Sequence, residues 1–495
     1  MKKRLMSLAQ GLADDPAAVR VTADAPNEEG TTVYCLHVGE GDVGCVIGKQ
    51  GRIVKAIRAM TCAVGTRSDA ALPLRKGSRL PARSRQYEIW YLLLLEALHL
   101  VLPLNWSDDS VFFQKASRLA LPQFLNGSSR VWIDTLTWCF AKQPIFWRVL
   151  NPLVLLLLAV LLTRLLRLRT QSQKIVLSLL ILYPAMVMAD AGFMATTLNY
   201  LWPFAMGVFV VYALLDCKPW RVVLAIPALL FAANMQQSAV GLLAALAILV
   251  FFFLQQKQSR KALLAAGYGV LTLASLGFLY YTSFFGENPR FLRETARYFP
   301  NFAALSLLQK VELGFSSTFL GFSSLTNRAT AASALLCLFL CAAALRREEK
   351  KWVKILAFVP PGLLTAIALF RLTGRNTRLW QLLSPAVDPK LSHAVYRFSL
   401  FETAAALLLL GVILLLLLRL VRTRKRQALL CGILALGFGL RLLMGFSPTV
   451  WASGCRTFFP SVMAVIVCIM MMIEEWNALR INSSSCGGKP SATEC

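Results

Sequence analysis

Apolar runs long enough to cross a lipid bilayer recur between residues 87 and 475, and they constrain the fold of this chain more than any other feature. A membrane-spanning helix needs about 20 mostly apolar residues, because the bilayer core holds no water to satisfy free backbone groups. Of the 495 residues, 57% are hydrophobic and only 16% are charged. The sequence therefore predicts a mainly α-helical, polytopic membrane bundle with about twelve spans. The expected spans lie near residues 87–104, 146–163, 175–190, 200–216, 221–233, 238–254, 262–284, 330–345, 353–370, 400–418, 428–443 and 457–474.

Short clusters of Lys and Arg between these runs set the expected orientation, because cytoplasmic loops are enriched in positive charge. The segment 67–86 is a basic linker, which places the start of the first span in the cytoplasm. With twelve spans, the even-numbered connections then fall on the cytoplasmic side, and they carry Arg164/Arg167/Arg169/Lys174, Lys218/Arg221, Lys257/Arg260/Lys261, Arg346/Arg347/Lys350/Lys351 and Arg419/Arg422/Arg424/Lys425/Arg426. We expect a multi-pass protein of a bacterial cell membrane with both termini in the cytoplasm, and a disordered tail over residues 476–495.

The first 66 residues have a different pattern, typical of a small α/β domain. Leu5, Leu8, Ala9 and Leu12 recur at helical spacing, and two stretches of alternating residues at 19–23 and 31–38 predict a pair of strands. A glycine-rich loop, Gly48-Lys49-Gln50-Gly51, then leads into a helix with one apolar and one basic side.

This arrangement resembles a KH domain, and the context Val46-Ile47-Gly-Lys-Gln-Gly-Arg is similar to the KhpA-like family of small bacterial single-KH RNA-binding proteins. The resemblance implies RNA as a partner. Glycines let the backbone approach phosphates closely, basic side chains supply charge, and an apolar groove accepts splayed bases. The expected RNA-binding residues are Val46, Ile47, Gly48, Lys49, Gln50, Gly51, Arg52 and Lys55.

Unusual polar and aromatic residues gather in the loops that this topology places outside the membrane. The motifs Trp-Ser-Asp-Asp-Ser at 106–110, Thr-Thr-x-Asn-Tyr-x-Trp-Pro at 196–203 and Gly-Phe-Ser-Pro-Thr at 445–449 are the most specific of them. They resemble an uncharacterised family of bacterial membrane proteins related to GT-C glycosyltransferases. The resemblance implies a transfer of sugar from a polyprenyl-phosphate carrier, with membrane lipids around the bundle.

An acidic residue in the first outer loop lies at the active site of GT-C enzymes, and the resemblance maps this role onto Asp108 or Asp109. Sugar transfer needs a base, or a divalent metal held by carboxylates, to activate the acceptor, and cations to stabilise the phosphate leaving group. No cofactor is assigned beyond that metal. The expected substrate-binding residues are Asn199, Tyr200, Trp202, Gln237, Arg290, Arg293, Arg441 and Arg456.

Other interpretations of these residues stay open. An acidic pair after a span also occurs where a helix end is simply solvated, outer arginines also contact lipid headgroups, and Tyr or Trp at this depth also anchors helices at the interface. Arg441, inside an apolar run, could reach the interface by snorkelling. The membrane part could then be a non-catalytic anchor for the RNA-binding domain, or a transporter or flippase-like protein.

The cysteines and histidines do not predict a zinc site. His37, His99 and His393 are far apart, and none of the twelve cysteines forms a Cys-x-x-Cys pair. The sequence thus predicts four parts: a KH-like domain (1–66), a basic linker (67–86), a multi-span membrane domain (87–475) and a tail (476–495).

Overall fold

The computed structural model describes residues 82–168, 170–284, 289–325, 327–346, 350–373 and 400–486, together with residues 6, 10, 15, 18–23, 34–37 and 396. The chain divides into two compact units, residues 1–79 and 80–495. In the first unit, strand β1 (Arg20–Ala23) pairs antiparallel with strand β2 (Tyr34–His37). This pairing confirms the expected strands over those residues, and the side chain of Val21 is buried.

The second unit is a bundle of helices, and a helix occupies each of the twelve expected spans. These helices are α4 (Ala82–Val101), α8 (Pro144–Leu165), α9 (Gln171–Val187), α11 (Trp202–Asp216), α12 (Pro219–Ala232), α13 (Gln236–Gln255), α14 (Ser259–Phe284), α17 (Thr330–Arg346), α18 (Lys351–Thr373), α20 (Leu400–Leu420), α21 (Arg424–Leu442) and α22 (Phe459–Cys486). Among the described residues, eight helices are long and apolar enough to cross a membrane, and α9, α12 and α17 are apolar but shorter. The structure therefore supports a mainly α-helical membrane protein, and the number of spans stays a prediction.

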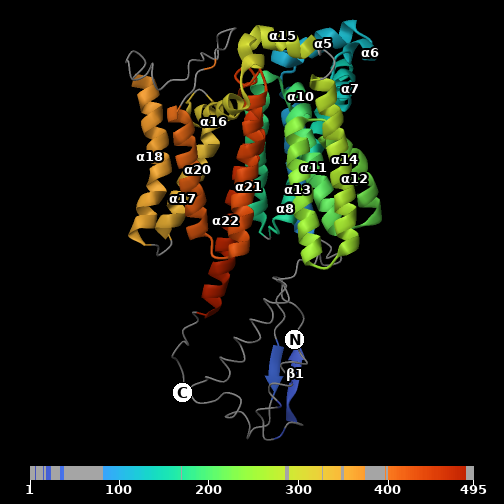
Figure 1. The fold of residues 1–495 in the computed structure, drawn as a ribbon. Helices are drawn as coiled ribbons and strands as arrows, with labels where there is room; N and C mark the ends of the chain where they lie inside the picture. Colours follow the sequence, from blue (N-terminus) through green and yellow to red (C-terminus); the bar gives the residue numbers. More distant parts are fainter. Residues whose placement is uncertain are drawn as a thin grey trace. The chain divides into compact units, whose positions relative to one another are not determined.

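Helices that follow one another in the chain pack side by side in this bundle (Figure 1). The pairs α11–α12, α13–α14 and α21–α22 have the closest contact. One apolar cluster of the core lies on α11, α12, α13 and α14. The two largest clusters lie one on α4, α8, α9 and α11 and the other on α17, α18, α20 and α21. Helix α22 contributes side chains to both clusters, Met463 to the first and Cys468 to the second, and it is the most buried of the eight candidate spans.

Short helices cover one end of the bundle, which we call the α5 end (Figure 1). They are α5 (Ser107–Arg118), α6 (Leu121–Phe124) and α15 (Pro289–Tyr298). Helix α7 (Val131–Lys142) and the turn η6 (Pro300–Ala304) follow α6 and α15 in the chain.

Helix α16 (Leu307–Ser323) lies between the expected seventh and eighth spans, where no helix was expected. It packs on α20, α21 and the turn η7 (Leu443–Phe446), and most of its residues from Glu312 onward are buried. Gly314 and Gly445 allow this contact: a Cβ added at Gly445 would lie 2.6 Å from the backbone nitrogen of Gly314. Glycine is needed at both positions because the two backbones meet there.

The segment before α11 is irregular. The turn η4 (Met188–Ala191), helix α10 (Phe193–Thr196) and the π-helical turn η5 (Thr197–Leu201) lead into α11. Pro203 has no backbone N–H to give to the carbonyl of Asn199, four residues earlier, so the regular ladder is interrupted there. Such π-helical turns occur frequently at functional sites.

Candidate functional site

Asp109 of α5 is fully buried and binds the start of α10. Its carboxylate oxygens accept hydrogen bonds from the backbone nitrogens of Met194, at 3.1 Å, and Ala195, at 2.8 Å. Free N–H groups at the start of a helix favour such an acceptor. Burial raises the pKa of the Asp109 carboxyl to about 6, against the opposing effect of these N–H groups. Asp109 therefore connects α5 with α10, two helices that are far apart in the sequence.

The backbone at Gly192 makes room for this carboxylate. Gly192 has φ +93°, and a Cβ added to it would lie 2.7 Å from Cγ of Asp109. A side chain at this position would meet both a strained backbone conformation and a steric clash. Gly192 lies four residues before the motif at 196–203. A glycine so close to this motif is the feature of the sequence that could have predicted the contact with Asp109.

Asp108, the neighbouring carboxylate, forms an ion pair with Arg456 of the turn η8 (Gly454–Phe458). The Asp108 side chain is 44% exposed and that of Arg456 is 23% exposed, so the pair faces the surface of the α5 end. Two residues expected at one site, separated by 348 positions, are thus in contact. Their charges are opposite and solvent reaches them, which leaves the carboxylate accessible to a polar ligand.

Asn199 lies in η5 and accepts a hydrogen bond at 2.6 Å from the guanidinium of Arg130. Its amide nitrogen donates to the carbonyl of Ala195 at 2.7 Å. Arg130, in the loop before α7, was not expected to take part in the site. The sequence held no signal for this contact, because Arg130 is one of many Lys and Arg residues in the connections expected outside.

Trp202 is buried in the core rather than at the surface of the α5 end. Its indole nitrogen donates to the side-chain oxygen of Asn151 at 2.9 Å, and its ring packs on Phe140 and Phe231. The Asn151 amide nitrogen lies 2.7 Å from Nε2 of His99, so a polar chain joins three helices. In this environment Trp202 acts as a packing residue.

Gln237 and Arg441 are both buried, and Gln237 contacts the backbone at the residue before Arg441. The Gln237 amide nitrogen donates to the carbonyl of Leu440 at 2.9 Å and to that of Thr457 at 3.4 Å. The guanidinium carbon of Arg441 lies 4.3 Å from the centre of the Phe458 ring. Tyr200 is half-buried and near enough to interact electrostatically with Arg441.

Not all of the expected residues are described. Arg293 is exposed on α15. Arg290 lies in the same helix, and its side chain is outside the described residues, as are the whole of the RNA-binding loop 46–52 and Lys55. Within the described part of the chain, no group of three or more His, Cys, Asp or Glu residues is arranged to hold a metal ion.

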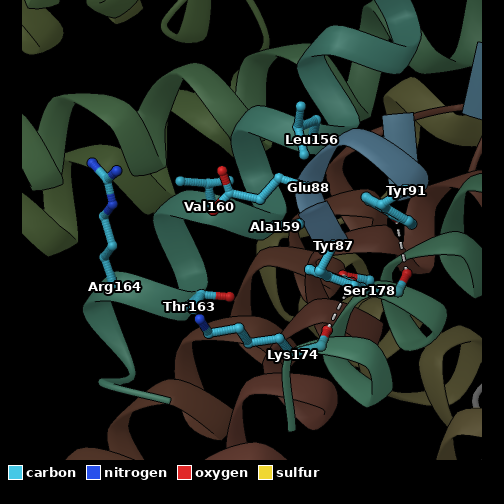
Figure 2. A pocket seen from close by; sticks show the side chains of 10 residues that line it. All are labelled: Tyr87, Glu88, Tyr91, Leu156, Ala159, Val160, Thr163, Arg164, Lys174 and Ser178. Atoms are coloured by element: carbon cyan, nitrogen blue, oxygen red, sulfur yellow. Dashed lines mark hydrogen bonds between the residues drawn. The ribbon is translucent and has the colours of Figure 1, made fainter. Parts of the chain in front are cut away.

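A pocket lies at the opposite end of α4 from Asp108, between α4, α8 and α9 (Figure 2). The hydroxyl of Tyr91 donates to the carbonyl of Ser178 at 3.1 Å, and that of Tyr87 donates to the carbonyl of Lys174 at 3.1 Å. Arg164 also lines this pocket. Since Arg164 and Lys174 belong to connections expected in the cytoplasm, this is the end of the bundle expected to face the cytoplasm.

Comparisons with known proteins match the first unit. A family model described as KhpA/KhpB, KH domain matches residues 2–74. The RNA-binding protein KhpA of Listeria monocytogenes is 43% identical over 75 residues, which cover 15% of this chain and 95% of that protein. The proteins of the same name from Chlamydia trachomatis (35% over 74 residues, 15% of this chain and 92% of that protein) and Oceanobacillus iheyensis (42% over 66 residues, 13% and 85%) are also similar. No solved structure matches.

Proposed function

This chain belongs, through residues 2–74, to the KhpA/KhpB KH-domain family, and on that premise we propose that its N-terminal unit binds RNA beside a membrane. The observation that carries the proposal is that this unit covers 95% of a KhpA protein at 43% identity. The loop Gly48-Lys49-Gln50-Gly51 supports it, since its glycines permit close approach to phosphates and its lysine supplies charge. Eight helices of the described residues are long and apolar enough to cross a membrane, and we infer that they attach this RNA-binding unit to the bilayer.

The experiment measures binding of a labelled pool of cellular RNA to the full chain in detergent. The double variant Lys49→Asp/Gln50→Asp introduces negative charge into the loop that faces the phosphates. We expect its Kd to rise by about tenfold or more, which corresponds to roughly 1.4 kcal/mol or more.

The matched control is Lys76→Asp/Ser78→Asp, which changes the net charge by the same amount in the basic linker just outside the matched segment. Its Kd should stay within a few-fold of the parent, because only general electrostatic attraction changes. Equal weakening by both variants would mean that RNA is attracted by charge alone, and would contradict recognition by the KH loop.

For the membrane domain we propose a second function, transfer of a sugar from a polyprenyl-phosphate carrier at the α5 end. The contact between Asp108 and Arg456 favours this function, because the contact brings a partly exposed carboxylate next to a cation. In such a transfer Asp108 accepts the proton of the acceptor hydroxyl, while Arg456 stabilises the phosphate oxygen that departs. Asp109, held by the backbone of α10, positions Asp108.

A transfer assay with a lipid-linked sugar and the purified chain tests this proposal. Asp108→Asn should lower turnover by about a hundredfold or more if the carboxylate acts as a base. The exchanged pair Asp108→Arg/Arg456→Asp keeps an ion pair between α5 and η8, so it should keep the thermal stability of the parent while losing turnover. Turnover equal to the parent in Asp108→Asn would remove the transferase proposal and leave the membrane domain as an anchor or a transporter.

A further inference from the structure

Arg441 is a buried cation that forms no ion pair with any residue that the structure describes. It is 2% exposed, and its Nε and Nη1 atoms have no hydrogen-bond partner among the described residues. Phe458 covers one face of the guanidinium, and a ring face attracts a cation but gives nothing to its N–H groups. Burial of an unpaired charge is costly, so these N–H groups favour an acceptor that carries negative charge.

Gln237 adds a second unsatisfied group at the same place. Its amide nitrogen is bound to the carbonyls of Leu440 and Thr457, the residues immediately before Arg441 and Phe458. Its oxygen Oε1 is buried and has no hydrogen-bond partner in the part of the chain that the structure describes. The Gln237 side chain is therefore held against the backbone just before Arg441 and Phe458, with one acceptor atom unused.

Thr318 of α16 provides a third buried polar group, a hydroxyl without a hydrogen-bond partner among the described residues. Thr318 lies on the same helix face as Gly314 and Gly321, which are four residues before it and three after it. A Cβ added at Gly314 would lie 2.6 Å from the carbonyl oxygen of Leu442, and one at Gly321 would overlap the Phe458 ring. This face of α16 therefore packs on the segments that carry Arg441 and Phe458.

From this convergence we propose that Arg441, Gln237 and Thr318 form an internal binding site for a phosphate group between α13, α16, α21 and η8. Two guanidinium N–H groups and a hydroxyl suit the oxygens of a phosphate, and charge-assisted hydrogen bonds of this kind are the strong ones. The free oxygen of Gln237 accepts from a P–OH group or from a hydroxyl next to the phosphate. The site is independent of sugar transfer, because holding a phosphate group needs no reaction.

The test measures thermal unfolding of the full chain with two probes. One is inorganic phosphate in a neutral maltoside detergent, compared with chloride at equal ionic strength. The other, for the chain in nanodiscs, is phosphatidic acid in phosphatidylcholine, compared with phosphatidylcholine alone. Stabilisation by inorganic phosphate identifies a free phosphate ligand, and stabilisation by phosphatidic acid alone identifies a lipid phosphate; either result supports the site.

Arg441→Gln should weaken the apparent affinity for the active probe by about tenfold or more, and Thr318→Val, which replaces the hydroxyl with a methyl group, should weaken it by a smaller factor. The matched control is Arg424→Gln, which removes the same charge from an exposed position on the same helix, and it should bind as the parent does. Arg441→Gln should also unfold at a higher temperature than the parent without ligand, because it removes an unpaired buried charge.

Two results would overturn the proposal. One is an unchanged transition for the parent chain with both probes, which would leave water as the partner of these groups. The other is equal stabilisation of the parent, Arg441→Gln and Thr318→Val by the active probe. Because Thr318→Val carries no change in charge, its affinity for the active probe tests the proposed site even if Arg441→Gln does not fold.

Discussion

At the scale of single residues, the two neighbouring aspartates of α5 have opposite environments. Asp109 is enclosed and bound by backbone N–H groups, whereas Asp108 is partly exposed and bound by Arg456. Identical side chains one position apart therefore differ in role: one holds the loop, and the other is available to a ligand. The sequence predicted a functional carboxylate here and could not say which, because burial of a loop residue depends on what packs over it.

The raised pKa of Asp109 predicts a pH dependence of stability. Its pKa is about 6 in the folded chain and about 3.9 when unfolded, so between these values only the folded chain keeps the proton. The free energy of unfolding should fall by up to about 3 kcal/mol as pH rises from 4 to 7. Thermal unfolding of the parent and of Asp109→Asn across this range checks it. In Asp109→Asn this fall in the free energy of unfolding should be absent. If stability changes with pH in the same way in both proteins, Asp109 is not the group responsible.

Gly192 predicts a matched pair of substitutions. Gly192→Ala should lower the unfolding temperature strongly, because it adds a clash with Asp109 to an unfavourable φ of +93°. Gly127→Ala, at φ +75° with no atom within 4 Å of the added Cβ, carries the backbone strain alone. We expect a loss of about 1–2 kcal/mol for Gly127→Ala and at least twice that for Gly192→Ala. Equal losses would show that the clash is relieved without cost.

At the scale of elements, the contact between α16 and η7 depends on the absence of side chains. Gly445→Ala would bring a Cβ within 2.1 Å of the carbonyl oxygen of Lys310, so it should separate the two elements and destabilise the bundle by roughly 2–4 kcal/mol. Gly439→Ala, in α21 with open space around its Cβ, is the control, and it should be neutral or slightly stabilising. Unfolding temperatures in detergent measure both variants; a neutral Gly445→Ala would contradict this packing.

Elements with a strong periodic signal were predictable, and the others were not. Each expected span contains a helix, because about twenty apolar residues leave the backbone no other way to satisfy its hydrogen bonds in lipid. The strands at 20–23 and 34–37 followed from alternation. Helix α16 was missed because its polar and small residues, such as Glu312 and Ser316, do not resemble a span, and only packing against other helices buries them. The π-helical turn before Trp202 follows from the local effect of a single proline, which hydropathy does not register.

At the scale of the whole molecule, the expected threading places the KH unit and the α5 end on opposite sides of the membrane. This predicts a labelling pattern with a membrane-impermeant thiol reagent on intact cells. Asn126→Cys, exposed in the loop before α7, should gain a label relative to the parent, and Gln256→Cys, exposed after α13, should gain one only after the cells are opened. Labelling of Gln256→Cys in intact cells would reverse the orientation and remove the proposed outer site.

The shared position of α22 has a consequence for biosynthesis. The two largest apolar clusters draw side chains from this one helix, and it is synthesised after all the other described helices. Neither of these two clusters can complete its packing before α22 is made, whereas the cluster on α11, α12, α13 and α14 takes no side chain from it. Ribosome stalling within the last helix would therefore leave the two largest clusters unfinished together.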